Sequence, residues 1–65
     1  DRHNLMAYYR KGDKTLLVVG NYQWDEQKIT LPSECKKVLI NNYPDLISSD
    51  EQITLHGYQV LILEL

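Results

Sequence analysis

This chain has few of the residues that cross-link a small domain or bend its backbone. It contains one cysteine, two prolines and three glycines in 65 residues, and it has no phenylalanine. The single cysteine, Cys35, excludes an internal disulfide, so a hydrophobic core has to hold the fold. An unpaired thiol also fits a reducing compartment better than an oxidising exterior, and we therefore expect a cytoplasmic protein.

An excess of positive charge and long hydrophobic runs are missing as well. Seven Lys and Arg against nine Asp and Glu give a formal net charge of −2. Nucleic-acid binding needs clustered cations, whereas the lysines here are dispersed among acids, so we expect no nucleic-acid partner. Aliphatic runs such as Val60–Leu63 are far shorter than a membrane span. We therefore expect no membrane partner, and we find no signal peptide.

The side chains that could carry chemistry do not form a catalytic or metal-binding pattern. His3, Cys35 and His56 lack the short spacings of metal ligands, so we expect no metal and no cofactor. Cys35 with His56 could in principle act as nucleophile and base, but a bystander cysteine is the simpler interpretation. The acids fall in predicted turns, and the glycines stand alone instead of forming a phosphate-binding loop. We predict no catalytic residue, which leaves open whether the chain belongs to an enzyme.

What the sequence does contain is a series of short β-strand patterns. The run Thr15–Gly20 carries aliphatic side chains on both faces, because side chains alternate in direction along a strand. The polar segment Lys11–Lys14 separates it from a second apolar run, Leu5–Arg10, and this arrangement predicts an antiparallel hairpin. Further strands are predicted at Gln27–Leu31, Lys37–Asn41, Gln52–Leu55 and Tyr58–Leu65. We interpret Leu46–Asp50 as loop or short edge strand, and Ser33–Lys36 as a loop with at most one helical turn.

These patterns together predict an all-β fold of about six strands. No segment shows a helical period, and the strands are joined by glycine, proline and asparagine turns. We predict a small antiparallel two-sheet β-sandwich with Greek-key-like connections, and a partly open barrel is the alternative. The length allows one domain, residues 1–65. The chain begins with Asp1 instead of methionine, which indicates a fragment of a larger protein.

Two predicted strands, Thr15–Gly20 and Tyr58–Leu65, are apolar on both faces, although only one face of each sheet meets the core of a sandwich. Loops such as 42–51 could cover the second face. Alternatively, this face docks against a neighbouring domain. We hypothesise an exposed apolar docking patch, and its candidate residues are Leu17, Val19, Leu61 and Leu63.

The aromatic residues are the remaining candidates for ligand binding. Trp24 lies in a predicted turn beside Asp25 and Glu26, and Tyr22 precedes it closely. Aromatic rings can stack on sugar rings while polar neighbours bind the hydroxyls, so Trp24 and Tyr22 are candidate sugar-stacking residues for an oligosaccharide. The simpler alternative is that Trp24 packs over the sheet edge.

Read in order, several of these stretches resemble the C-terminal β-domain of bacterial α-glucosidases of glycoside hydrolase family 13, the group of oligo-1,6-glucosidases, dextran glucosidases and trehalose-6-phosphate hydrolases. The similar stretches are Met6–Arg10, Lys14–Tyr22, Ile29–Pro32, Val38–Tyr43 and Leu55–Leu61. Three positions depart from the family pattern. Gly57 stands where the family usually has proline, Gln59 where it usually has glutamate, and Tyr22 where phenylalanine is common.

The resemblance implies a non-catalytic accessory domain of an enzyme that hydrolyses α-glucosidic bonds in oligosaccharides. The catalytic barrel of such an enzyme would lie upstream, so the resemblance assigns no catalytic residue to this chain. It also implies a partner for the two-sided strands, because in the family this β-domain packs against the barrel. Two alternatives stay open: a carbohydrate-binding module that uses Trp24 and tyrosine side chains, and a free-standing β-domain that dimerises through its second apolar face.

Overall fold

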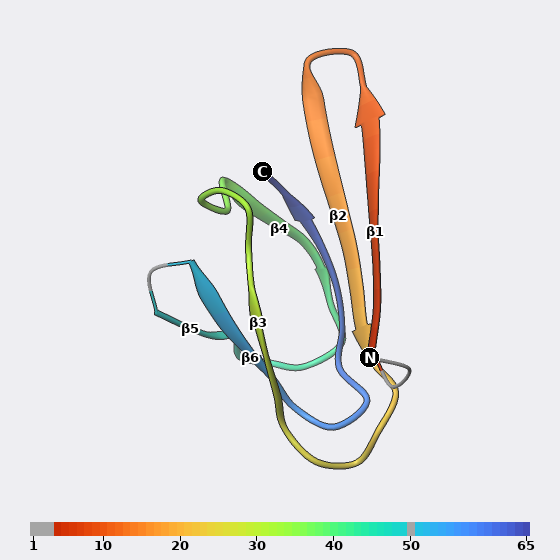
Figure 1. Ribbon diagram of the computed structural model, residues 1–65, viewed down its shortest axis with the longest axis vertical. Coiled ribbons are helices and arrows are strands. Elements are labelled where there is room, and N and C mark those ends of the chain that lie inside the picture. Colours follow the sequence, from red (N-terminus) through yellow and green to blue (C-terminus); the bar gives the residue numbers. More distant parts are fainter. Residues whose placement is uncertain (1–3, 50) are drawn as a thin grey trace.

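The chain folds into two packed antiparallel sheets in the computed structural model, which describes residues 4–49 and 51–65 (Figure 1). One sheet has the strand order β1-β2-β7-β4 and the other β3-β6-β5. The strands are β1 (Asn4–Lys11), β2 (Lys14–Asn21), β3 (Gln27–Thr30), β4 (Lys37–Asn41), β5 (Ile47–Ser49), β6 (Gln52–Leu55) and β7 (Val60–Glu64). The chain crosses repeatedly between the sheets, so the order within each is non-sequential. The predicted all-β sandwich is confirmed.

The predicted strands are found close to their predicted bounds. The additional strand, β5, falls within the segment 46–50 that the sequence left between loop and strand; Asp50 itself lies outside the described residues. The helical turn considered after Ser33 does not form, and this segment is irregular. No part of the chain that the structure describes forms a helix long and apolar enough to cross a membrane.

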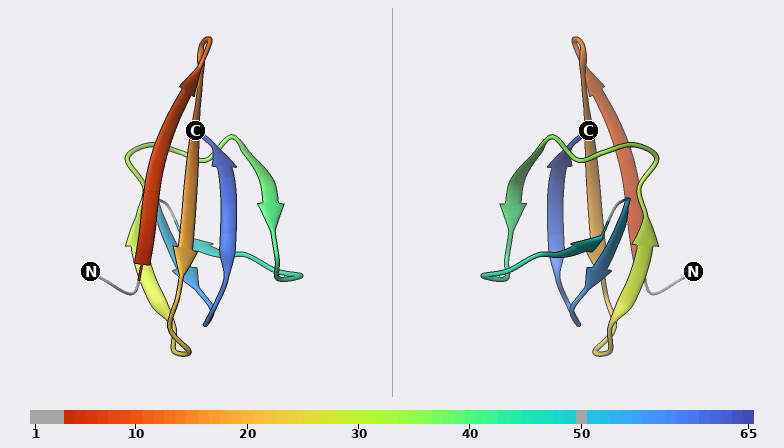
Figure 2. Two further views of the ribbon diagram at one scale, coloured as in Figure 1. Left: turned by 90° about the vertical axis from the view of Figure 1, so that its right-hand side faces the viewer. Right: turned by 90° about the vertical axis from the view of Figure 1, so that its left-hand side faces the viewer.

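The β1–β2 hairpin extends beyond the rest of the sandwich and turns at Gly12 and Asp13 (Figure 2). Gly12 has a φ of 64°, and a Cβ added there would meet no atom within 4 Å. A two-residue loop with glycine at a positive φ in its first position is typical of a type II′ hairpin turn, whose twist matches that of the strands. Backbone conformation, not lack of space, therefore requires glycine at this position.

Replacing Gly12 with alanine should lower the free energy of unfolding by about 1–3 kcal/mol through backbone strain alone. Gly12→Asn should cost less, because asparagine tolerates positive φ better than alanine does. Chemical denaturation of the two variants measures the difference. Equal losses would show that a different cause, and not the φ angle, sets the requirement for glycine.

The core lies between the two sheets. Leucine and valine side chains of β2 and β7 pack against isoleucine and leucine side chains of the β3 and β6 region. The buried cluster is Leu17, Val19, Ile29, Leu31, Ile53, Leu55, Leu61, Leu63 and Leu65. Ile29 and Leu31 alternate with exposed Lys28 and Thr30, which is the one-sided pattern expected of β3.

The predicted docking patch is wrong in its residues. Leu17, Val19, Leu61 and Leu63 are each 0% exposed and form the centre of the core. Both residue parities of β2 and β7 are apolar, and only the packing against the second sheet decides which of them faces inward. The second apolar face therefore belongs to the alternate residues of the same strands.

Two asparagine side chains, of which Asn21 is buried and Asn41 is half-buried, close the same end of the four-stranded sheet. Asn21 at the end of β2 accepts a hydrogen bond from the Gln23 amide (3.2 Å) and donates to the Asp25 carbonyl (2.9 Å). Asn41 at the end of β4 repeats this geometry with the Tyr43 amide (2.9 Å) and the Asp45 carbonyl (2.9 Å). Each strand thus leaves the sheet through an asparagine-stabilised turn of defined shape.

Candidate functional site

The outer face of the four-stranded sheet is apolar across all four strands. The strand registers align one row of side chains over this face, Ala7, Val18, Ile62 and Ile40. Residues directly opposite each other in paired strands point to the same side, and this row alternates with the buried core residues. Ala7, Val18 and Ile62 are half-buried, and Ile40 is 53% exposed. No element that the structure describes in residues 4–49 and 51–65 belongs to a third layer over this face.

Further apolar side chains widen this surface, and charge is confined to one end of it. Tyr9 lies opposite Leu16 in the neighbouring row, and that row ends in the charged pair Glu64 and Lys37. The Lys14 ammonium lies 4.0 Å from the Glu64 carboxylate at the same end. We call the residues Ala7, Tyr9, Leu16, Val18, Ile40, Val60 and Ile62 the outer patch. A contiguous apolar patch over a whole sheet is characteristic of a surface that another domain covers.

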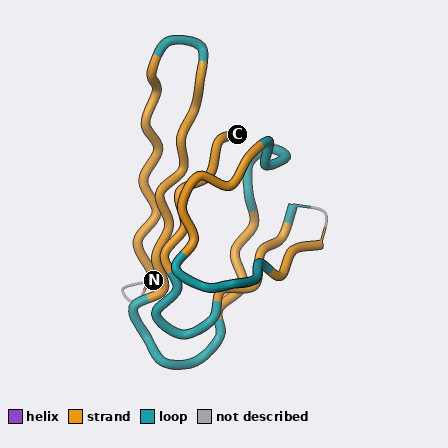
Figure 3. Tube along the Cα trace, turned by 180° about the vertical axis from the view of Figure 1, so that it is seen from behind, coloured by secondary structure: helices purple, strands orange, loops and turns teal. Residues whose placement is uncertain are grey.

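A second candidate site lies at the end of the sandwich opposite the hairpin tip, where the β2–β3 and β6–β7 loops run side by side (Figure 3). The Tyr58 amide donates to the Gln23 carbonyl (3.1 Å), and the Asn21 side chain donates to the His56 carbonyl (3.0 Å). These bonds fix the two loops to each other. Three exposed aromatic side chains stand on them, Tyr22, Trp24 and Tyr58.

The predicted sugar-stacking residues differ in how they are held. A Cβ at Gly20 would lie 3.1 Å from the ring and hydroxyl of Tyr22, so this ring covers the sheet backbone and has one face occupied. Trp24 is 81% exposed, which contradicts the alternative that it packs over the sheet edge. Tyr58 was not singled out from the sequence, because it was assigned to the last strand instead of the turn before it.

The β6–β7 turn has an unusual arrangement of residues. The backbone N–H of Gln59 donates to the His56 carbonyl (3.1 Å). This bond closes a four-residue turn with Gly57 and Tyr58 in the middle. Tyr58 has a φ of 59°, a region that bulky residues rarely adopt and that favours glycine or asparagine. Gly57 does not need its flexibility for a positive φ. A Cβ there would stand 2.1 Å from the Trp24 carbonyl oxygen, so close approach of the Trp24 loop requires glycine.

A buried polar network supports this turn. Gln59 is 0% exposed; its side-chain oxygen accepts from the His56 amide (2.8 Å) and its nitrogen donates to Asn41 Oδ1 (2.9 Å). The His56 ring stacks on Tyr43 with centroids 4.6 Å apart, and its Nε2 lies 3.1 Å from Asp45 Oδ1. The Tyr43 hydroxyl donates to the Gly57 carbonyl (2.6 Å), so these side chains brace the turn and do not form a free reactive group.

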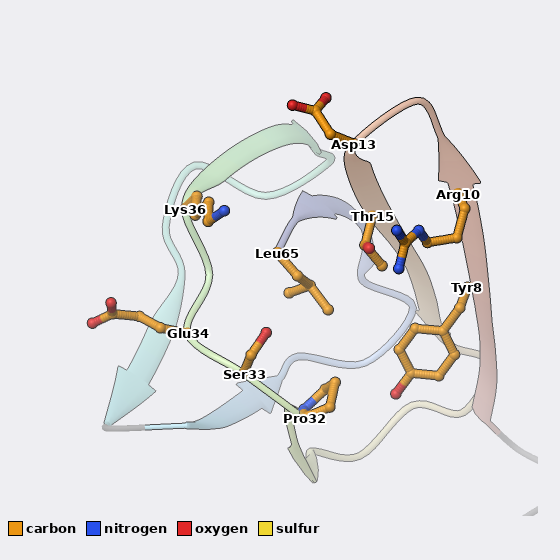
Figure 4. Close-up of a pocket in the computed structure, with 9 residues that line it drawn as sticks. All are labelled: Tyr8, Arg10, Asp13, Thr15, Pro32, Ser33, Glu34, Lys36 and Leu65. Carbon is orange, nitrogen blue, oxygen red and sulfur yellow. The ribbon is translucent and has the colours of Figure 1, made fainter.

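A cavity of about 470 Å³ lies between the β1–β2 hairpin and the loop before β4 (Figure 4). Its lining residues are Tyr8, Arg10, Asp13, Thr15, Pro32, Ser33, Glu34, Lys36 and Leu65. The two carboxylates, Asp13 at the hairpin tip and Glu34 on the loop before β4, both point outward from the cavity in Figure 4. General acid–base work on a glycosidic bond needs two carboxylates facing one substrate, so this cavity does not have the geometry of a glycosidase centre.

Among the residues that the structure describes, no three His, Cys, Asp or Glu side chains are placed to hold a metal ion. Cys35 is half-buried, and its thiol lies 3.5 Å from the Lys37 carbonyl oxygen. His56 is engaged with Asp45 and Tyr43, so Cys35 and His56 have separate surroundings. The candidate surfaces are therefore binding surfaces: the outer patch and the aromatic loops.

The fold is that of a small β-sandwich domain whose four-stranded sheet has an apolar outer face. Residues 5–62 match the family described as the C-terminal domain of the α-amylase SusG, and the chain belongs to that family. A search of curated proteins gave no match.

Solved structures of glycoside hydrolase family 13 enzymes contain the same fold. The chain is similar to part of trehalose-6-phosphate hydrolase from Bacillus licheniformis, with 28% identity and a TM-score of 0.81. The match covers 98% of this chain but only 13% of the hydrolase. It is also similar to part of isomaltulose synthase from Erwinia rhapontici NX5, which was solved with its natural substrate sucrose. The identity is 25% and the TM-score 0.84, and the match covers 98% of this chain and 12% of the synthase. The resemblance to the C-terminal β-domains of family 13 enzymes is confirmed.

Proposed function

We propose that this chain is the accessory C-terminal domain of a larger family 13 enzyme and stabilises the catalytic barrel by packing the outer patch against it. The observation that carries the proposal is the apolar row Ala7, Val18, Ile62 and Ile40, which spans four strands of a sheet with no third layer in the described residues. The chain spans only 12–13% of the length of the similar solved enzymes, which are therefore about eight times longer than the matched segment. A domain of this kind has a large neighbour available.

The activity of the whole enzyme in this proposal is hydrolysis of α-glucosidic bonds in oligosaccharides. The family 13 membership of the similar structures supports it. The catalytic acids would belong to the barrel, since the described part of this chain brings no two carboxylates together over its cavity. A cytoplasmic location is part of the same proposal, and its support is the unpaired thiol of Cys35.

Sequencing the gene upstream of Asp1 tests the proposal directly. We expect an open reading frame that encodes a catalytic barrel in the same polypeptide. The upstream segment and this chain can then be produced separately and mixed, and sedimentation velocity or calorimetry measures their association. A reading frame without a glycosidase domain would contradict the proposal. So would the absence of any association between the two parts when both are folded.

Substituting Ile62 with aspartate should weaken this association about 100-fold, equivalent to roughly 2.7 kcal/mol, because the carboxylate would be buried without a partner at the interface. The isolated domain should keep its fold, since Ile62 is on the outer face. Thr30→Asp is the matched control: it places the same charge on the outward side of β3, in the other sheet. Equal weakening by both substitutions would show that net charge, and not the outer patch, controls association.

A further inference from the structure

We propose that the two loops carrying Trp24 and Tyr58 form a binding site for a neutral oligosaccharide, separate from the outer patch. The inference does not require the docking of a catalytic barrel. It rests on the exposure of Trp24, on the strained backbone of Tyr58, and on the rigid connection between the loops that hold them.

The first step is the exposure of a tryptophan on a fixed loop. Trp24 exposes 81% of its surface, although indole is among the side chains that gain most from burial. The loop beneath it is not loose: Asn21, 0% exposed, donates to the Asp25 and His56 carbonyls and accepts from the Gln23 amide. A large apolar ring on a preorganised loop loses little conformational freedom when a ligand binds, which favours affinity.

The second step is backbone strain at the neighbouring ring. Tyr58 occupies the turn position that glycine or asparagine would occupy without strain, and its ring is 58% exposed. Strained positive-φ residues cluster at ligand-binding sites, where the side chain is needed for function. The Tyr58 backbone is held by its bonds to Gln23 and to the Asn42 side chain, and its ring is outside the core cluster, so the ring is available for contact with a ligand.

The third step concerns Gly57. Any side chain at this position would collide with the Trp24 carbonyl, since a Cβ would stand 2.1 Å from its oxygen. The missing side chain at Gly57 therefore allows the Trp24 loop to approach the β6–β7 turn closely.

The flanking side chains select the class of ligand. Gln23, Asp25 and Glu26 flank Trp24 in the sequence, whereas the centre of a protein-docking surface is typically depleted of charged residues. Two carboxylates disfavour an anionic ligand. A pyranose ring fits both requirements, because its C–H face can stack on an aromatic ring while its hydroxyl groups donate to carboxylates.

Fluorescence titration of the chain tests the proposal, and Trp24 is its single tryptophan, so any signal comes from the proposed site. The probes are maltotriose and isomaltotriose, with cellotriose and xylotriose as differently linked sugars. We expect a saturable change in emission at millimolar sugar for at least one of them. No saturable change with any of the four would overturn the proposal while leaving the docking of the outer patch untouched.

Three variants make the test specific, with binding followed by amide chemical shifts in NMR spectra. Trp24→Ala should abolish binding, and Tyr58→Gly should weaken it by about 5- to 10-fold, the factor that corresponds to one aromatic contact, while raising the melting temperature. Tyr8→Ala is the matched control, an exposed tyrosine of β1 outside both the outer patch and the aromatic loops, and should bind normally. A lower melting temperature for Tyr58→Gly, or equal losses for Tyr8→Ala, would contradict the proposal.

A protein partner on the same loops is the competing outcome. If Trp24 contacts protein instead of sugar, its fluorescence should become protected from acrylamide quenching when the upstream domain is added, and sugar should have no effect. That result would also overturn the proposal.

Discussion

Replacing Leu61 with alanine should lower the free energy of unfolding by about 2–5 kcal/mol. Leu61 is 0% exposed on the strand between β2 and β4, and its side chain is part of the cluster that joins the two sheets. The substitution removes three heavy side-chain atoms and leaves a cavity that a small core cannot fill by rearrangement. A domain of 65 residues has little stability to lose, so a large unfolded population at ambient temperature is the expected result.

Ile62→Ala is the matched control for this prediction, one residue along the same strand. Ile62 lies on the outer face and is half-buried, so its truncation should cost well under 1.5 kcal/mol in the isolated domain. Urea denaturation of both variants measures the difference. A similar cost for the two would mean that the outer face is covered in the isolated chain, for example by a second copy, and sedimentation would then reveal a dimer.

Replacing Gln59 with glutamate should destabilise the domain by about 2–4 kcal/mol at neutral pH. The Gln59 nitrogen donates to Asn41 Oδ1 (2.9 Å) and to the Asp45 carbonyl (3.4 Å), both of which can only accept. A glutamate carboxylate at position 59 would place an oxygen atom against these two acceptor oxygens at a buried site. Asn41 cannot turn to compensate without losing its bonds to Tyr43 and Asp45.

The stability loss of this variant should depend on pH. Burial without a donor raises the pKa of the introduced carboxyl group above its unfolded value of about 4.3. The variant should therefore approach wild-type stability near pH 4, where the carboxyl group is protonated in both states and can donate to Asn41, and lose stability as the pH rises. Gln52→Glu, at an exposed position of β6, should show no such dependence. A loss independent of pH would attribute the effect to packing instead of charge.

The sequence was sufficient to predict the strands and their hairpin, because alternation and turn residues are local signals. It was not sufficient to orient β2 and β7. Leu17 and Val18 are both apolar, and only the packing of their sheet against β3 and β6 decides that Leu17 is buried. The sequence pattern therefore predicts that each strand has a second apolar face, but it does not show which of the two alternating sets of residues forms that face. The docking residues predicted from it are the buried set.

The turn at residues 56–59 shows the other limit of sequence reasoning. A Gly-Tyr pair after a strand gives no indication that tyrosine adopts the positive φ and that glycine makes room for a distant carbonyl. That requirement comes from Trp24, more than thirty residues earlier in the chain. A signal was present in the departure of Gly57 from the family pattern, but its cause is visible only in three dimensions.

The irregular register of β4 affects the exposed edge of the four-stranded sheet. β4 is an edge of its sheet, and its Val38, Leu39 and Ile40 are all exposed, so its free backbone groups could template the growth of a fibril. Among the described strand pairs, only its pairing with β7 contains a register shift, between Val38 and Ile40. Such a bulge bends and twists the edge strand, which disfavours continuation of the ladder by a second chain, so this edge should resist amyloid-like stacking.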